Sequence, residues 1–310
     1  MSILSRPKVA ATVAKVLQGA AGAAMERAIK PRERFPEYPG RTEELTVPTS
    51  VVPAGVTVYR PESSDPLPAV HVNFHGGGYV MRGAVLDDPL CRTIAALAGV
   101  VVVNVDYVVA PQHHFPDLPH QAYDVVAWVA ANGAEHGWDA SRLTIGGQSA
   151  GGALAAAVAR LALENGTPAI ALQVLHYPPL DLTVPAGTKH STIAKPALKP
   201  WMGEVFDSAY VPDAAQRNDR LVSPAGSADT ADITGIAPAV VLTAEHDILR
   251  AEGERYAERL RAAGALVEYV EIAGVDHGYD AQDVERAREV YPKIAAFIAA
   301  ATKKATPQKG

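Results

Sequence analysis

The chain has 310 residues, of which 48% are hydrophobic and 20% are charged, so it can bury a large core and is neither disordered nor fibrous. Its formal net charge of −6 argues against a nucleic-acid partner, because phosphate binding needs a clustered basic surface. The single cysteine, Cys91, excludes an intrachain disulfide and a cysteine-rich zinc site. No run of 18 apolar residues occurs, so we expect no stable membrane insertion.

The first predicted element is an alanine-rich stretch over residues 9–25. Arg6 and Lys8 precede it, as basic residues precede the apolar part of a secretory signal. Lys15 and Gln18 interrupt the stretch, however, and its apolar residues recur at helical spacing. We therefore predict an amphipathic helix and a cytoplasmic protein, with secretion as the alternative.

Short apolar runs then alternate with helical patterns along most of the chain. Residues 43–60 alternate apolar and polar side chains around Pro53 and Gly55, which predicts an antiparallel hairpin. The strands predicted after it are AVHVNF (69–74), VVVVNVDY (100–107), LTIGG (143–147), AIALQVLHY (169–177), AVVLTAEHD (239–247) and LVEYVEI (266–272). Amphipathic helices separate them, the last over about 281–301. This order predicts one α/β domain over 1–310, with a mostly parallel sheet and helices on both faces.

Two stretches, 1–40 and about 183–222, do not follow this alternation. The second is too long for an ordinary connection between strands, so it should carry its own structure or a function. Within it, apolar residues recur every four positions in two rows, which predicts a helix with a wide apolar face. The rows are Trp201, Val205 and Ala209, and Met202, Phe206 and Tyr210. This helix either packs on the core or covers a pocket.

A serine nucleophile is indicated where a predicted strand ends and a helix begins. There Gly147, Ser149 and Gly151 form the pattern Gly-x-Ser-x-Gly, which in this context is typical of a nucleophile elbow. The serine sits at a sharp, strained turn, and glycines avoid the Cβ atoms that would collide. The N–H of Ala150, at the helix start, can donate to an oxyanion.

A glycine-rich turn, His75-Gly76-Gly77-Gly78, follows the strand at 69–74. Chance would produce this tetrapeptide only about 0.005 times in a chain of this composition, against about 0.07 times for the serine pattern. Consecutive glycines leave N–H groups uncovered, which is what the second half of an oxyanion hole requires.

A serine needs a base and an orienting acid, and both are found at predicted strand ends. His277 follows the last predicted strand, and Asp247 follows the strand before it. The carboxyl ends of parallel strands are where such sheets place their sites, and Ser…Asp…His is the order of α/β-hydrolases. Glu245 and Asp276 compete for the role of the acid; we prefer Asp247.

Together these segments resemble the hormone-sensitive-lipase-like esterases of the α/β-hydrolase superfamily. The resemblance runs from about residue 71 to 279 through HGGGY, DYVVAPQHHFP, GGQSAGG, HDILRAEG and DHGY. It implies an α/β-hydrolase fold with a helical cap formed by about 1–40 and about 183–222, no cofactor, and ester hydrolysis. It also implies that Ser149, Asp247 and His277 form the catalytic triad. The N–H groups of the oxyanion hole would come from Gly77, Gly78 and Ala150, with Gly76 as an alternative to one of the first two.

Three positions depart from the family's usual pattern. Val108 and Gln112 stand where the family has Arg and Glu, and Gln148 stands where it has Asp before the serine. Each change replaces a charge by a neutral side chain. Since removing one partner of a buried ionic cluster costs several kcal/mol, we hypothesise that the three positions share one cluster behind the nucleophile.

Other polar residues have structural interpretations. Asp87 and Asp88 before a proline predict a helix N-cap, and His71, within a strand, is expected to be a hydrogen-bonded core residue. Cys91 is expected to be buried and inert. His113 and His114 lack a third ligand at metal-binding spacing, so no metal site is predicted.

The predicted function is therefore that of a serine carboxylesterase acting on small-molecule esters with short to medium acyl chains. The alternatives are an amidase or a lactonase with the same triad, and a ligand receptor without catalytic activity. The presence of His277 argues against the receptor. The sequence is compatible with a monomer or a homodimer. The residues expected to bind the acyl chain are Tyr79, Trp201, Met202, Val205, Phe206 and Tyr210.

Overall fold

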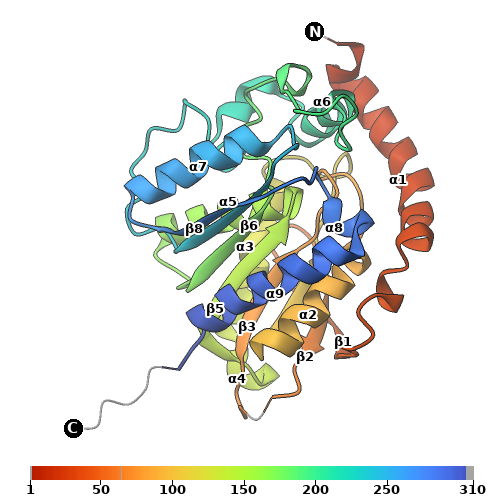
Figure 1. Ribbon diagram of the computed structural model, residues 1–310. Coiled ribbons are helices and arrows are strands. Elements are labelled where there is room, and N and C mark those ends of the chain that lie inside the picture. Colours follow the sequence, from red (N-terminus) through yellow and green to blue (C-terminus); the bar gives the residue numbers. More distant parts are fainter. Residues whose placement is uncertain (1, 64, 305–310) are drawn as a thin grey trace.

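The computed structural model describes residues 2–63 and 65–304 (Figure 1). Within them, one eight-stranded sheet has the order β1-β2-β4-β3-β5-β6-β7-β8. β1 and β2 form an antiparallel hairpin and β2 pairs antiparallel with β4, while all later neighbours pair in parallel. The strands are β1 (Arg41–Val47), β2 (Ala54–Arg60), β3 (Ala69–Phe74), β4 (Val101–Asp106), β5 (Asp139–Gln148), β6 (Leu172–His176), β7 (Ala239–Ala244) and β8 (Leu266–Ile272).

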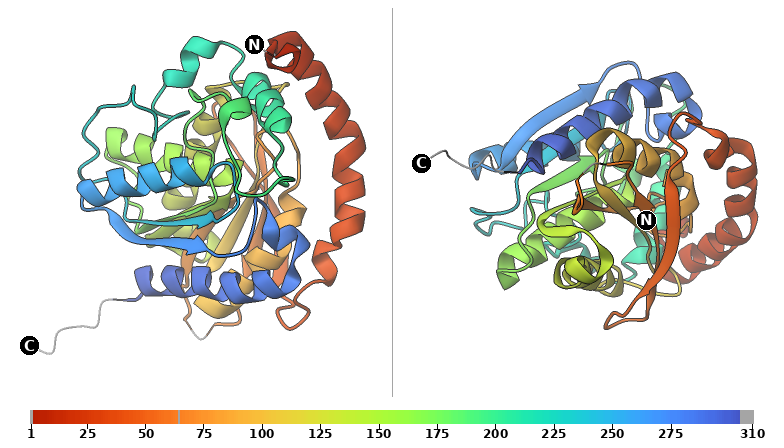
Figure 2. Two further views of the ribbon diagram at one scale, coloured as in Figure 1. Left: turned by 45° about the horizontal axis from the view of Figure 1, so that its top comes forward. Right: turned by 90° about the horizontal axis from the view of Figure 1, so that it is seen from below.

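Helices cover both faces of this sheet, as Figures 1 and 2 show. Buried residues of α3, α5 and α7 share one apolar cluster with the sheet, and those of α2 and α9 share the other. The helices are α1 (Pro7–Ile29), α2 (Asp88–Ala98), α3 (Asp117–Ala131), α4 (Gly133–His136), α5 (Ala150–Asn165), α6 (Pro200–Tyr210), α7 (Arg250–Ala262), α8 (Tyr279–Gln282) and α9 (Val284–Ala301). Short 3-10 turns lie at Ile3–Ser5, Pro31–Glu33, Ala84–Asp87, Ala186–Thr188 and Ala214–Asn218.

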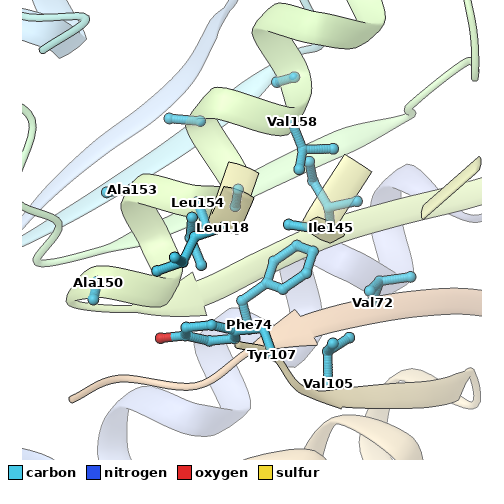
Figure 3. Packing of buried hydrophobic residues seen from close by; sticks show 14 of the residues in the cluster. Val72, Phe74, Val105, Tyr107, Leu118, Ile145, Ala150, Ala153, Leu154 and Val158 are labelled. Carbon is cyan, nitrogen blue, oxygen red and sulfur yellow. The ribbon is translucent and has the colours of Figure 1, made fainter. Parts of the chain in front are cut away.

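The central strands are apolar along their whole length because both of their faces are buried. In β4, Val101 and Val103 belong to one cluster and Val102 to the other. Side chains alternate across a strand, so a strand covered on both sides reads as a continuous valine-rich run rather than as an alternating one. Figure 3 shows the α3 and α5 side, where Phe74 and Ile145 of the sheet pack near Leu118, Leu154 and Val158.

Helix α1 lies on the outside of the molecule, beside α6 (Figures 1 and 2). Ala10 and Ala14 are fully buried, whereas Val16 is 63% exposed, so the helix is amphipathic as predicted. The Gln18 side chain donates hydrogen bonds to the carbonyls of Val80 (2.7 Å) and Ala110 (2.8 Å). The polar residue that interrupts the alanine-rich stretch thus attaches α1 to two loops of the sheet domain.

The structure confirms the hairpin, the mostly parallel sheet and the helices on both faces, and it corrects several details. The strand predicted at 143–147 extends over the whole of β5. The strands predicted at 169–177 and 239–247 are shorter, because β6 begins at Leu172 and β7 ends at Ala244. Asp87 stands at the N-cap position of α2, but its side chain caps no N–H; it accepts a hydrogen bond from Asn73 Nδ2 (2.9 Å) instead. Cys91 is buried, and His71 Nδ1 bonds the Thr144 hydroxyl (2.9 Å), as expected. None of the described helices is long and apolar enough to cross a membrane.

Candidate active site

The turn between β5 and α5 holds Ser149 in a strained conformation, with φ 51° and ψ −121°. A Cβ at Gly147 would lie 2.3 Å from the Phe74 carbonyl oxygen, and one at Gly151 would lie 1.8 Å from it. Only glycine allows this close passage of β3 past the turn. The Ser149 N–H donates to the His176 carbonyl (2.8 Å), which anchors the turn to the end of β6.

The structure brings together the three side chains that the sequence singled out as a triad. Ser149 Oγ lies 2.9 Å from His277 Nε2, and His277 Nδ1 lies 2.7 Å from Asp247 Oδ2. The three residues follow β5, β8 and β7, so the parallel order of these strands delivers them to one edge of the sheet. The geometry is that of a nucleophile, a base and an acid that orients the base.

The two competing acids have other partners. Glu245 accepts a hydrogen bond from the N–H of Gly274 (2.7 Å), and Asp276 accepts from the N–H groups of Ala197 (2.5 Å) and His277 (2.7 Å). Neither bonds the imidazole. Asp247 is 3% exposed, and its second oxygen accepts from the Leu249 N–H (3.0 Å), so both of its oxygens are held.

Opposing influences act on the pKa of His277. Burial lowers this pKa, but the Asp247 carboxylate at Nδ1 raises it, and Asp276 and Asp280 raise it further. The net result is a pKa above the usual 6.5. A more basic imidazole is a better acceptor for the serine proton, provided that the pH keeps it neutral.

The turn after β3 carries the glycines predicted to form the oxyanion hole. Gly77 has φ 124°, Gly78 has φ 60° and the following Tyr79 has φ 62°, so three successive residues have positive φ. The N–H groups of Gly77 and Gly78 have no hydrogen-bond acceptor among the residues that the structure describes. Ala150 is the first residue of α5, where an N–H has no carbonyl partner within its own helix.

A cavity of about 300 Å³ opens beside Ser149 and His277. Of the six residues expected to bind the acyl chain, Tyr79, Met202 and Phe206 line it. The other three do not: Trp201 is 40% exposed to solvent, and Val205 and Tyr210 are buried in the apolar core. The expectation for these three was wrong, because only one side of the wide apolar face of α6 is turned toward the cavity.

The cavity also has lining residues that the sequence analysis missed. The apolar ones include Met81, Leu198, Ile248 and Leu249. Ile248 and Leu249 directly follow Asp247, so their adjacency to a triad residue was the signal that could have found them. The charged ones, which no local pattern indicated, are Arg34, Arg82, Asp87, Lys189, Asp207 and Asp280.

Asp207 is unusual among these charged residues. It is only 7% exposed, yet its carboxylate has no hydrogen-bond or ion-pair partner among the described residues. The nearby Lys189 pairs with Glu252 instead, at 2.6 Å. Burial raises the pKa of Asp207 to about 6, although the charge of Lys189 opposes this.

The three departures from the family's pattern do not share one cluster, which corrects our hypothesis. Gln112 exchanges hydrogen bonds with Gln18 on α1. Gln148 donates to Asp280 on α8. At Val108 the backbone N–H donates to Gln121 Oε1 (2.7 Å). The three positions therefore have separate surroundings, and each must be explained by its own neighbours.

No group of three or more His, Cys, Asp or Glu side chains in the described part of the chain is arranged to hold a metal ion. The adjacent histidines have local partners: His113 Nδ1 lies 3.0 Å from Asp117, and His114 Nδ1 lies 2.9 Å from the Ala209 carbonyl.

Comparison with known proteins finds relatives that are named as ester hydrolases. A family model described as the alpha/beta hydrolase fold matches residues 71–281. The chain is 38% identical over 253 residues to carboxylesterase NlhH of Mycobacterium tuberculosis, which covers 80% of this chain and 78% of that one. It is 36% identical over 228 residues to the ethyl acetate hydrolase of Pseudomonas putida, which covers 72% of this chain and 70% of that one.

Solved structures agree with these relatives. The hyperthermophilic esterase from Pyrobaculum calidifontis superimposes with a TM-score of 0.84 at 33% identity, covering 94% of each chain.

Proposed function

Because this chain belongs to the α/β-hydrolase family, among the hormone-sensitive-lipase-like esterases, we propose that it is a serine carboxylesterase for short to medium acyl esters. The observation that carries the proposal is the continuous hydrogen-bonded chain from Asp247 through His277 to Ser149 beside an apolar cavity. The names of its relatives, a carboxylesterase and an ethyl acetate hydrolase, support the same reaction.

The reaction follows from the positions of the atoms. Asp247 accepts a hydrogen bond from the Nδ1–H of His277, which leaves the Nε2 lone pair facing Ser149 Oγ. His277 takes the hydroxyl proton as Oγ attacks the ester carbonyl, and then gives that proton to the departing alcohol. The acyl group is left on Ser149. Water then attacks the acyl-enzyme in the same way and restores the serine.

The negative charge of each tetrahedral intermediate needs donors that are already in place. The N–H groups of Gly77, Gly78 and Ala150 are the proposed donors. Two observations support them: the glycine N–H groups have no other acceptor among the described residues, and the Ala150 N–H stands at the start of α5. Gly76 remains the alternative to one of the two glycines, because its N–H has no acceptor among the described residues either.

We further propose that about 1–40 and about 183–222 act as one cap over the site within a single domain. Its support is the packing of α1 beside α6, together with the cavity lining that Arg34, Lys189, Met202 and Phe206 contribute from these two segments. A cavity of about 300 Å³ under such a cap suits a small or medium acyl chain rather than a triglyceride.

Amidase and lactonase activities use the same triad, so substrates must distinguish them. The test is the hydrolysis of nitrophenyl butanoate, matched with the butanoyl anilide and a lactone. We expect the ester to be turned over fastest. Faster hydrolysis of the anilide or the lactone would replace the esterase assignment by that alternative.

Labelling of the serine by a fluorophosphonate tests the catalytic role itself. Wild-type protein should label at Ser149, whereas Ser149→Ala should not label and should lose several orders of magnitude in turnover. A protein that binds ligands without catalysis would not label. Retention of more than a few per cent of activity by Ser149→Ala would show that the nucleophile is wrong.

The cytoplasmic location and a homodimer are also proposals. The packing of α1 into the fold, with Ala10 and Ala14 buried, supports its role as a structural helix. β8 forms one edge of the sheet and its Val267 is 54% exposed, which offers a surface to a second copy. Cell fractionation tests the first proposal and light scattering of the purified protein tests the second.

A further inference from the structure

Asp280, on α8, is a carboxylate outside the triad that collects three hydrogen-bond donors. Its Oδ1 accepts from the Tyr177 hydroxyl (2.6 Å), and its Oδ2 accepts from the Tyr291 hydroxyl (2.9 Å) and from the Gln148 amide. Asp280 is 2% exposed. A buried carboxylate with this many donors acts as an acceptor, so the arrangement holds it in one orientation.

Two of the three donors come from segments that adjoin the triad. Gln148 immediately precedes the nucleophile, and Tyr177 follows β6, whose last residue, His176, accepts the Ser149 N–H. The ring of Tyr177 lies edge-on to the His277 ring, with the centroids 5.0 Å apart. Asp280 thus connects the nucleophile turn to the loop that carries the histidine.

Tyr177 has φ 40°, a conformation that a bulky residue adopts only when its surroundings impose it. Two bonds do so: its N–H donates to the Leu242 carbonyl (2.7 Å) and its hydroxyl donates to Asp280. Arg34 holds α8 itself by donating to the carbonyls of Asp280 (3.1 Å) and Ala281 (2.8 Å).

We propose that Asp280 is a positioning residue of the esterase reaction, held by Gln148 and Tyr177, which fixes His277 and adds negative charge that stabilises its imidazolium form. The proposal rests on the proposed function. It also accounts for the departure at position 148. An aspartate there would place a second carboxylate against Asp280, whereas the glutamine amide donates to it.

Several other groups face His277 and must be counted with Asp280. Asp247 lies after β7, Asp276 adjoins the histidine in sequence, and Ser149 faces Nε2. From the β6 side, burial lowers the pKa of His176 to about 4, so this histidine adds no positive charge at neutral pH. Removal of Asp280 should therefore lower the pKa of His277, because its charge is one of those that raise it.

The test compares Asp280→Asn, Gln148→Asp and the double variant Gln148→Asp/Asp280→Asn by the pH dependence of kcat/KM. Asp280→Asn should move the acidic midpoint down by roughly half a unit to one unit and lower kcat about tenfold with KM nearly unchanged. Gln148→Asp adds a carboxylate and should move the midpoint up. In the double variant the carboxylate lies at position 148 and the amide donor at position 280, so the pair is kept with its members exchanged. Both the midpoint and kcat of the double variant should therefore return toward the wild-type values.

Asp283→Asn is the matched control. Asp283 is exposed, three residues further along, and its side chain caps α9 by accepting from the Arg286 N–H. Asparagine can still accept that N–H, so this substitution should change the melting temperature little and leave the midpoint unchanged. If Asp280→Asn lowers the melting temperature and also leaves the midpoint unchanged, Asp280 has only a structural role and the proposal is wrong. A double variant no better than Gln148→Asp alone would equally contradict the matched pair.

A direct titration separates this proposal from the proposed function. The His277 ring can be titrated by NMR in the Ser149→Ala protein, where no ester is turned over. Asp280→Asn should lower the measured pKa there as well, whatever the substrate. If Asp280→Asn does not fold, Tyr177→Phe removes one donor only, and it should shift the same titration by a smaller amount. An unchanged titration in the folded variant would overturn the proposal even if the esterase assignment holds.

Discussion

The ring of Phe206 on α6 lies directly against the backbone of Gly78 in the glycine-rich turn. A Cβ built at Gly78 would stand 2.3 Å from Phe206 Cδ2. The helix that lines the cavity and the turn proposed to stabilise the oxyanion are therefore in contact, and a side chain at position 78 cannot be added without moving one of them.

Gly78→Ala should lower kcat about a hundredfold, because displacing an oxyanion donor costs that much. Gly99→Ala is the matched control: Gly99 has a similar φ of 66°, but the nearest atom to an added Cβ is 4.0 Å away. It should cost about 1 kcal/mol of stability and leave the activity unchanged. Steady-state kinetics on nitrophenyl butanoate measures both. Gly78→Ala/Phe206→Ala should recover part of the lost activity, and no recovery would mean that the Phe206 contact is not the cause.

The pH profile of kcat/KM should fall on the acid side through a midpoint above 6.5. His277 must be neutral to accept the serine proton, and the carboxylates around it raise its pKa against the effect of burial. Rates measured from pH 5 to 9 with a soluble ester give the midpoint. A flat profile between pH 5 and 8 would argue against His277 as the base.

Asp207→Asn should stabilise the protein in a pH-dependent way. The pKa of Asp207 is raised to about 6 in the folded state by burial, so ionisation costs the folded protein free energy that the unfolded chain does not lose. This cost is absent below the unfolded pKa of about 4, grows up to pH 6 and is constant above it. Urea unfolding should show a gain of about 3 kcal/mol at pH 8 and little difference at pH 3.5. Lys189 keeps its partner Glu252 in the variant.

Equal stabilisation by Asp207→Asn at both pH values would show that the Asp207 carboxylate is not the source of the cost.

The length of the acyl chain should determine the rate until the cavity is full. We expect kcat/KM to rise from acetyl to butanoyl or hexanoyl esters, at about 0.8 kcal/mol for each buried methylene, and to fall beyond about ten carbons. Met202→Ala should move the optimum toward longer chains, since Met202 lines the cavity. Trp201→Ala is the neighbouring control and should leave the optimum unchanged, because Trp201 is turned to solvent. Faster hydrolysis of emulsified triolein than of butanoate esters would contradict this size limit.

Local patterns in the sequence were sufficient to predict the sheet and the three side chains of the proposed triad. A strand buried on both faces must be a continuous apolar run. A nucleophile turn must carry a glycine where a Cβ would stand 2.3 Å from the Phe74 carbonyl oxygen of β3. The order of strands in a parallel sheet then places the residues after β5, β7 and β8 at one edge. Both requirements are visible in the spacing of neighbouring residues, so no tertiary information was needed for them.

Only the tertiary structure decided which side chains surround that triad. The apolar rows of α6 predict a helix with a wide face, but its packing against α1 and the sheet determines that Met202 and Phe206 reach the cavity while Val205 and Tyr210 enter the core. Gln148 finds its partner in Asp280, 132 residues away, rather than near Gln112. Hydrogen bonds between distant segments depend on how whole elements pack, and the residue types at a single position do not encode that packing.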